Sequence, residues 1–280
     1  MQRYRYRLLN VFAPSTLAGN PLCVFEAATD MSTELMQALA IQFNLSETTF
    51  LLPSERATAR VRIFSPGGEF PFAGHPVLGS AFVVRELFDA GDAFTLETHA
   101  GVIPLTCEGD VYRLRANPPN TRAPAQSMIE LAAAVGLGAD DLTAPPLWID
   151  TGFEQLVVPA RTLAALKNAR VDVTRAQALL NSIGLTKIYL WVRESADVVQ
   201  ARFFFTRGPG QIGEDPGTGS ACANLGGWLL HTGANLPVRL TVHQGDHLGR
   251  PCRLHLTVDS ERNIFVGGRV VQLGTGEVCL

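Results

Sequence analysis

Two glycine-rich turns are the first parts of this sequence that could do chemistry. One reads Ala73-Gly74-His75-Pro76 and the other Asp215-Pro216-Gly217-Thr218-Gly219-Ser220, and each precedes a run of small and apolar residues. A helix that starts at such a turn leaves its first amide groups without backbone partners and carries partial positive charge, and glycine lets a ligand approach closely. We therefore expect the two turns to bind a carboxylate, with ordinary tight helix entries as the alternative.

Glu47 is the candidate for acid–base chemistry. It stands in Leu45-Ser46-Glu47-Thr48-Thr49-Phe50 and leads into an apolar segment. Burial there would raise the pKa of the carboxyl group, and a carboxyl group that titrates near neutral pH can both take and give a proton. On the residues alone, a surface glutamate at the start of a strand is an equal alternative.

Four further polar residues flank the turns. His75 stands at the first turn, where its ring would titrate near neutral pH, and Asp215 stands at the second turn. The alternatives are a capping or core histidine and an N-cap aspartate. Ser220 could donate to a substrate carboxylate or cap its helix. We expect Glu69 to be a solvated turn residue, with contact to the site as the alternative.

The composition excludes several classes of protein. The 280 residues are 46% apolar and 18% charged, and the net charge is −3. A chain with this charge lacks the excess of basic residues that favours binding to nucleic acid or to an anionic membrane surface. No apolar run is long enough to span a membrane, and no signal peptide is evident. Five scattered cysteines favour reduced thiols in a cytoplasmic protein, and the lack of a CxxC pair argues against a cysteine zinc site. No Rossmann or P-loop glycine pattern occurs, so we expect no nucleotide cofactor. His243 and His247 lack the fixed spacing of a metal site.

Short strands dominate the predicted secondary structure, at 6–12, 22–25, 47–52, 59–64, 188–192, 238–242 and 254–258. Ser32 predicts the N-cap of a helix with one buried face, and Ser127 with Glu130 predicts a capping box for a second helix that ends at Gly136. A further helix is expected over Thr174–Ile183, ending at Gly184. Residues 77–84 and 225–230 are apolar nearly all round and predict two buried helices.

The second half of the sequence repeats the order of motifs found in the first half. Arg62-Ile63-Phe64 precedes the first turn, and Arg202-Phe203-Phe204 precedes the second. After each buried helix comes a similar strand that ends at Gly101 or Gly245. This repetition predicts an α+β fold of two related halves, each a curved, mostly antiparallel sheet around a central helix, with a ligand cleft between them. The predicted halves are residues 1–118 and 119–280, and the last strand can return to the first half.

Several of these segments together resemble the phenazine-biosynthesis isomerase (PhzF-like) family. They are 44–50, Arg62-Ile63-Phe64-Ser65-Pro66, Phe72-Ala73-Gly74-His75-Pro76 and 214–221, in order over nearly the whole chain. The resemblance implies the diaminopimelate epimerase fold, a homodimer, and isomerisation of trans-2,3-dihydro-3-hydroxyanthranilate. It implies Glu47 as the group that moves a proton between carbons, with His75, Asp215 and the two turns holding the substrate.

This sequence differs from related sequences at positions that bear on the reaction mechanism and on the substrate. Related epimerases and proline racemases use a cysteine before the glycine of each turn, where this chain has Ala73 and Pro216, so a two-thiol mechanism is not expected. Cys222 is expected to be a buried apolar residue. The segment Cys222-Ala223-Asn224 replaces a pattern closer to Ala-Gly-Pro in phenazine-pathway enzymes, so the substrate could differ. An epimerase or lyase acting on another amino or hydroxy acid, and a non-catalytic carboxylate-binding protein, remain alternatives.

Overall fold

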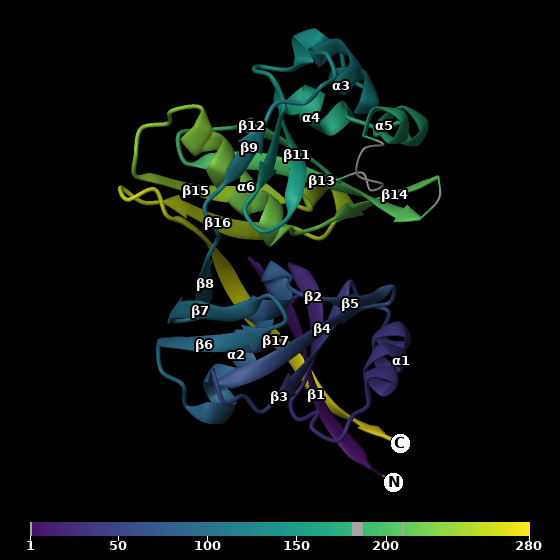
Figure 1. Ribbon diagram of the computed structural model, residues 1–280, viewed down its shortest axis with the longest axis vertical. Coiled ribbons are helices and arrows are strands. Elements are labelled where there is room, and N and C mark those ends of the chain that lie inside the picture. The colour runs from purple at the N-terminus through teal and green to yellow at the C-terminus, as the bar shows by residue number, and fades with distance from the viewer. Residues whose placement is uncertain (1, 181–186, 209) are drawn as a thin grey trace. The chain divides into compact units, whose positions relative to one another are not determined.

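The computed structural model describes residues 2–180, 187–208 and 210–280 (Figure 1). Its contacts divide the chain into two compact units. Unit 1 comprises residues 1–115 and 267–280, and unit 2 comprises residues 116–266.

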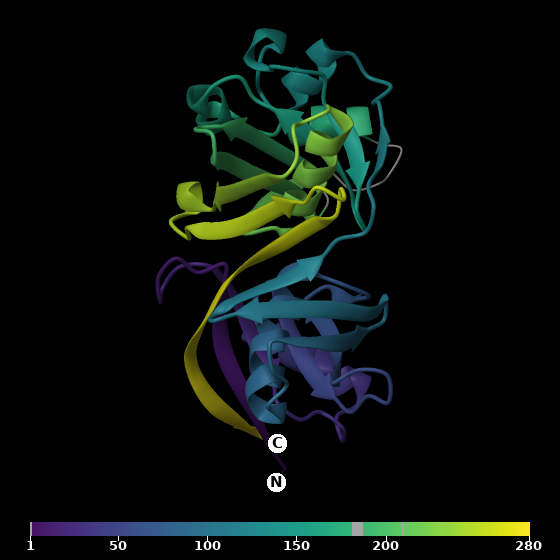
Figure 2. The same cartoon turned by 90° about the vertical axis from the view of Figure 1, so that its left-hand side faces the viewer.

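Unit 1 is a barrel of strands around one helix. Strands β17, β1, β2, β3, β4, β6, β7 and β8 pair in that order, and β8 pairs with β17 to close the ring. The last strand returns beside the first, as Figure 2 shows in yellow and purple. The helix α2 contacts β1, β2, β3, β4 and β8, and nine of its residues are buried. The bounds are β1 Arg3–Val11, β2 Asn20–Phe25, α1 Thr33–Phe43, β3 Glu47–Leu52, β4 Ala59–Ser65, β5 Gly68–Phe70, α2 Gly74–Phe88, β6 Ala93–Thr98, β7 Gly101–Glu108, β8 Val111–Arg115 and β17 Ile264–Cys279.

Unit 2 is a second sheet packed on a helix. Strands β9, β10, β11, β12, β13, β15 and β16 pair in that order, and β14 forms a hairpin with β13. The helix α6 contacts β9, β10, β11 and β16. The bounds are β9 Asn120–Arg122, α3 Met128–Ala134, η1 Ala139–Asp141, β10 Leu147–Asp150, β11 Glu154–Pro159, α4 Leu163–Asn168, α5 Val173–Leu180, β12 Lys187–Arg193, β13 Val198–Gly208, β14 Gln211–Asp215, α6 Gly219–His231, β15 Val238–Gln244, η2 Asp246–Leu248 and β16 Cys252–Val258.

The two units use the same succession of pairings. In unit 1, β2 runs parallel to β3, β3 antiparallel to β4, and β4 parallel to β6, with the β4–β5 hairpin and α2 in between. In unit 2, β11, β12, β13 and β15 repeat these directions, with the β13–β14 hairpin and α6 in between. Each glycine turn therefore lies between a hairpin and a buried helix.

The local signals in the sequence are confirmed. Ser32 caps α1 by accepting a hydrogen bond from the Leu35 amide. Ser127 and Glu130 form the predicted capping box of α3, and Gly136 follows with a positive φ of 72°. These signals are readable from sequence because each interaction spans three or four residues.

Three details differ from expectation. The first strand ends at Val11, because Phe12 has a φ of 59° and leaves the extended conformation. The N-cap of α6 is Thr218, and Asp215 instead ends β14. The helix predicted over 174–183 is present to Leu180 as α5, and its expected end at Gly184 lies outside the described residues.

Candidate functional site

Glu47 and His75 meet in unit 1. The Oε2 atom of Glu47 lies 3.5 Å from Nε2 of His75, and their side chains are 17% and 6% exposed. Glu47 is the first residue of β3, and His75 is the second residue of α2. The parallel pairing of Leu22 with Glu47 sets this carboxylate beside the start of β2, so the beginnings of two strands and one helix converge.

His75 is held as a neutral imidazole. Burial lowers its pKa to about 3, and a hydrogen bond to the backbone of Pro21 opposes that shift only in part. Proline has no amide hydrogen, so its carbonyl accepts and the ring donates. Nε2 has no hydrogen-bond partner among the described residues, so the donor is Nδ1, and Nε2 keeps a lone pair that faces Glu47. The side-chain amide of Asn20 also lies 3.5 Å from Nδ1.

Close packing fixes the start of α2 against the barrel wall. A Cβ atom added at Gly79 would lie 2.4 Å from Leu22 Cδ2 and 3.0 Å from Val11 Cγ2, so only glycine allows the helix this near to β1 and β2. On another face, Ser80 donates to the Thr49 hydroxyl over 2.9 Å. The N-cap residue Ala73 makes no side-chain cap, so the first amides of α2 are not occupied by a capping side chain.

Asp215 lies in a polar network at the start of α6 in unit 2. Gln244 accepts from the Thr218 amide over 3.3 Å, and its Nε2 donates to the Asp215 carbonyl and to the Thr218 hydroxyl. Because Thr218 accepts from Gln244, its own proton goes to Asp215 Oδ2, over 2.5 Å. Gly245 has a φ of 81° and its Cα lies so close to Pro216 that a Cβ would meet the Pro216 carbonyl at 2.5 Å. The end of β15 therefore holds this turn.

Ser220 is reached by a second buried network in the same unit. It accepts a hydrogen bond from Gln155 over 2.9 Å, and Gln155 accepts one from Asn224 over 2.9 Å. Gln155 and Asn224 are 1% and 0% exposed. Neither Ser220 nor Asp215 caps α6, because its N-cap residue is Thr218. The capping role that the sequence allowed for both side chains is therefore not observed.

The predicted site residues thus form two groups. Glu47, Gly74 and His75 lie together in unit 1, and Asp215, Gly217, Thr218, Gly219 and Ser220 lie together in unit 2. Glu69 is a partner of Arg62 rather than a solvated residue, since it accepts two hydrogen bonds of 2.7 Å from that guanidinium. Glu69 also contacts His99 at 3.0 Å.

Sequence reasoning missed the amide side chains that hold these residues: Asn20, Gln155 and Gln244. One signal was available, because Val238, Leu240, Val242 and Gln244 alternate on the buried face of β15, and a glutamine in a core position needs polar partners. Gln155 likewise stands in the buried strand β11.

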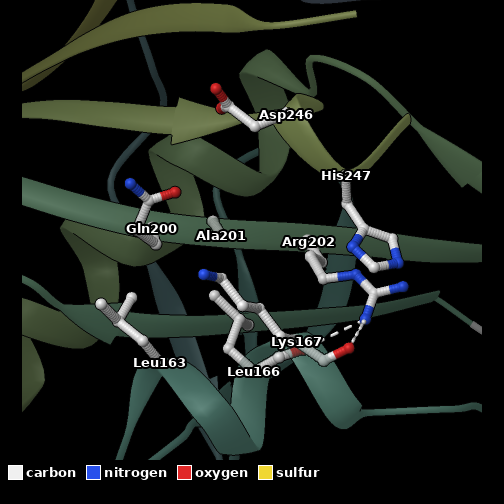
Figure 3. Close-up of a pocket in the computed structure, with 8 residues that line it drawn as sticks. All are labelled: Leu163, Leu166, Lys167, Gln200, Ala201, Arg202, Asp246 and His247. Carbon is white, nitrogen blue, oxygen red and sulfur yellow. Dashed lines mark hydrogen bonds between the residues drawn. The ribbon is translucent and has the colours of Figure 1, made fainter. Parts of the chain in front are cut away.

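A buried ion pair precedes the second turn, as Arg62 with Glu69 precedes the first. Arg202 donates to both carboxylate oxygens of Glu214, over 2.9 and 2.8 Å. It also donates to the carbonyls of Leu166, Lys167 and Ala169 at the end of α4, two of which Figure 3 marks. A cavity of about 230 Å³ borders this arginine, together with Lys167, His247 and neighbouring residues (Figure 3). The Arg202 guanidinium already donates hydrogen bonds to Glu214 and to backbone carbonyls, so it is not available to bind an anion in this cavity.

Cys222 and the side-chain types that bind metals are the remaining candidates for chemistry. Burial raises the pKa of the Cys222 thiol, so this cysteine packs as an apolar residue. Within the described ranges, no group of three or more histidine, cysteine or acidic side chains is arranged to hold a metal ion. No helix there is both long and apolar enough to cross a membrane.

Two proteins are similar in sequence to this chain over almost its whole length. A protein of Pasteurella multocida called an uncharacterized isomerase is 38% identical over 279 residues, which cover 98% of this chain and 94% of the relative. The trans-2,3-dihydro-3-hydroxyanthranilate isomerase of Pseudomonas aeruginosa is 33% identical over 258 residues, covering 90% of this chain and 89% of the relative.

Solved structures show the same fold. A phenazine biosynthesis protein of the PhzF family from Bacillus anthracis superposes with a TM-score of 0.88 at 26% identity over the full length of both chains. A hydroxyproline epimerase from Agrobacterium vitis superposes with a TM-score of 0.63 at 12% identity, over 99% of this chain and 93% of that one, so the epimerase-like fold is shared. The family model described as phenazine biosynthesis-like protein matches residues 9–276, and the chain therefore belongs to that isomerase family.

Proposed function

We propose that this protein is a cofactor-independent isomerase that moves a proton between carbon atoms of a small cyclic amino- or hydroxy-carboxylate, such as trans-2,3-dihydro-3-hydroxyanthranilate. The observation that carries the proposal is the Glu47 carboxylate, 17% exposed and 3.5 Å from a neutral histidine at the start of a buried helix. The named activity of the relative from P. aeruginosa supports the substrate class.

The proposed reaction needs only one acid–base group. Glu47 takes a proton from one carbon, the electron pair left behind moves into the conjugated system, and the protonated Glu47 returns the proton to a different carbon. The atoms of substrate and product are the same, and Glu47 ends in its starting state. While Glu47 holds the proton, the Nε2 lone pair of His75 can accept a hydrogen bond from it, which stabilises the intermediate state without taking the proton fully.

The starts of α2 and α6 supply the binding groups in this proposal. Each helix start offers uncapped amides to a carboxylate: Gly74 allows close approach at α2, and the segment Gly217–Ser220 allows it at α6. Asp215, which already accepts from Thr218, accepts a further hydrogen bond from the amine or hydroxyl group. We further propose that the two units arose by duplication, since they share one succession of pairings, and that two chains form a homodimer.

The test combines one variant with isotope exchange. Glu47→Gln keeps the size of the side chain and removes its acid–base function, so turnover of trans-2,3-dihydro-3-hydroxyanthranilate is expected to fall by a factor of about 10³ or more while binding is retained. Glu108→Gln, on an exposed glutamate of β7, is the matched control and should keep wild-type turnover. Incubation in deuterated water with NMR and mass detection locates the carbon that receives the proton.

Each alternative has its own result. Turnover of Glu47→Gln near the wild-type rate rules out Glu47 as the acid–base group. Stereoinversion or loss of water, observed with a panel of amino and hydroxy carboxylates, identifies an epimerase or a lyase. A carboxylate that binds tightly and remains unchanged on prolonged incubation identifies a binding protein.

A further inference from the structure

The start of α6 is reached by a chain of hydrogen bonds whose direction can be assigned from the backbone. The amide of Thr151 donates to Asn224 Oδ1 over 3.0 Å, and the carbonyl of Phe153 accepts from Asn224 Nδ2 over 2.9 Å. An amide N–H can only donate and a carbonyl can only accept. The orientation of the Asn224 side chain is therefore fixed at both ends.

This orientation determines the next two links. Asn224 Nδ2 also donates to Gln155, so the facing atom of Gln155 must be its oxygen, and its Nε2 must point to Ser220. Nε2 can only donate, so the Ser220 hydroxyl oxygen accepts over 2.9 Å. The proton of that hydroxyl is then left for another acceptor, because the Ser220 hydroxyl donates no hydrogen bond to a described residue.

Burial makes this directionality costly to reverse. Thr151, Gln155 and Asn224 are 7%, 1% and 0% exposed, so water does not compete for these groups. Reversing one amide would set donor against donor at one end and oxygen against oxygen at the other, and each buried polar group left unsatisfied is strongly unfavourable. The direction of the hydrogen bond to Ser220 is thus set by Gln155, 65 positions earlier in the chain, and by Asn224, one turn later in α6.

We infer that Gln155 and Asn224 are positioning residues that make Ser220 a hydrogen-bond donor to the substrate carboxylate, and so select an acceptor over an ammonium group at the start of α6. This inference rests on the proposed function, because it assigns the carboxylate of that substrate class to α6.

The test is a double-mutant cycle between Gln155 and Ser220, with 2-aminobenzoate as the probe and 2-aminobenzamide as its uncharged counterpart. In Gln155→Glu the new carboxylate still accepts from Asn224 but takes the Ser220 proton for itself. Ser220→Ala and Gln155→Glu are each expected to weaken 2-aminobenzoate binding about tenfold, the value of one hydrogen bond to a charged group. The double variant should be little weaker than either single variant, because both changes remove the same donated proton.

Two controls separate this effect from charge and from misfolding. Gln211→Glu, on an exposed residue of β14, adds the same charge to unit 2 and should bind as wild type. The three tryptophans, Trp148, Trp191 and Trp228, all lie in unit 2, so their fluorescence reports whether that unit is folded. If Gln155→Glu does not fold, Gln155→Met enters the cycle instead: it removes the donor that orients Ser220, so binding should weaken by a smaller factor, and that loss should disappear in the Ser220→Ala background. In turnover assays, the Gln155 variant should raise KM with kcat nearly unchanged, which a general structural defect would not do.

Additive losses in the cycle overturn the inference, because they mean that the Gln155 substitution acts through repulsion or structure and not through Ser220. Wild-type protein that binds the benzamide as well as the benzoate also overturns it. Failure of the proposed function gives a different result: 2-aminobenzoate binds with the expected coupling, but no tested carboxylate is isomerised.

Discussion

The buried neutral histidine predicts a specific dependence of stability on pH. Folding lowers the pKa of His75 from an ordinary 6.5 to about 3. Below pH 6.5 the unfolded chain takes up a proton at this position and the folded chain does not, so stability falls as the pH falls. The contribution is fully retained above pH 6.5 and declines by about 1.4 kcal/mol per pH unit, or roughly 4 kcal/mol between pH 6.5 and 3.5.

The measurement compares wild type with His75→Asn, whose amide can still donate to the Pro21 carbonyl. Urea unfolding followed by far-ultraviolet circular dichroism is recorded at several pH values from 7.5 to 4. At pH 7.5 the wild type should be more stable, because asparagine leaves part of the buried volume empty. That advantage should shrink as the pH is lowered, since only the wild type carries the histidine whose protonation favours the unfolded chain.

Two curves that stay parallel from pH 7.5 to 4 would refute this reasoning, because they would mean that His75 has the same proton affinity in the folded and unfolded states. His243, whose pKa burial also lowers, is common to both proteins and cancels in the comparison.

Two further substitutions test the packing that positions the site. Gly79→Ala should destabilise the protein by about 1–3 kcal/mol in urea unfolding, because the new Cβ would lie 2.4 Å from buried Leu22; Gly274→Ala, with no atom within 4 Å, should change stability by less than about 0.5 kcal/mol, and equal effects would disprove the packing argument. Arg202→Met should cost about 3–5 kcal/mol, and more than Arg62→Met, because it strands buried Glu214 and three carbonyls, whereas Glu69 keeps its contact with His99. A larger loss for Arg62→Met in thermal or urea unfolding would contradict this ranking.

Much of the local structure follows from the sequence because its causes are local. Ser32 and the Ser127–Glu130 box start their helices through contacts within three residues, and the apolar runs after the two turns become the buried helices α2 and α6. The alternatives for Asp215 could not be resolved in this way. In the sequence, Asp215 is a cap candidate because the start of the helix is not fixed by a local pattern. In the structure α6 begins at Gly219, and the pairing of β13 with β14 keeps Asp215 in the strand.

By itself, the sequence determined the types of the reactive groups and the helices that begin beside them: Glu47, His75 and the two glycine turns. Only the tertiary structure decided which groups meet. Glu47 and His75 are 28 positions apart and come within 3.5 Å because β2 and β3 pair in parallel and α2 packs closely against β1 and β2 at Gly79. The neutrality of His75 and the polarity of Ser220 are likewise tertiary, because both depend on exclusion of water and on partners, such as Pro21 and Gln155, that no local pattern connects to them.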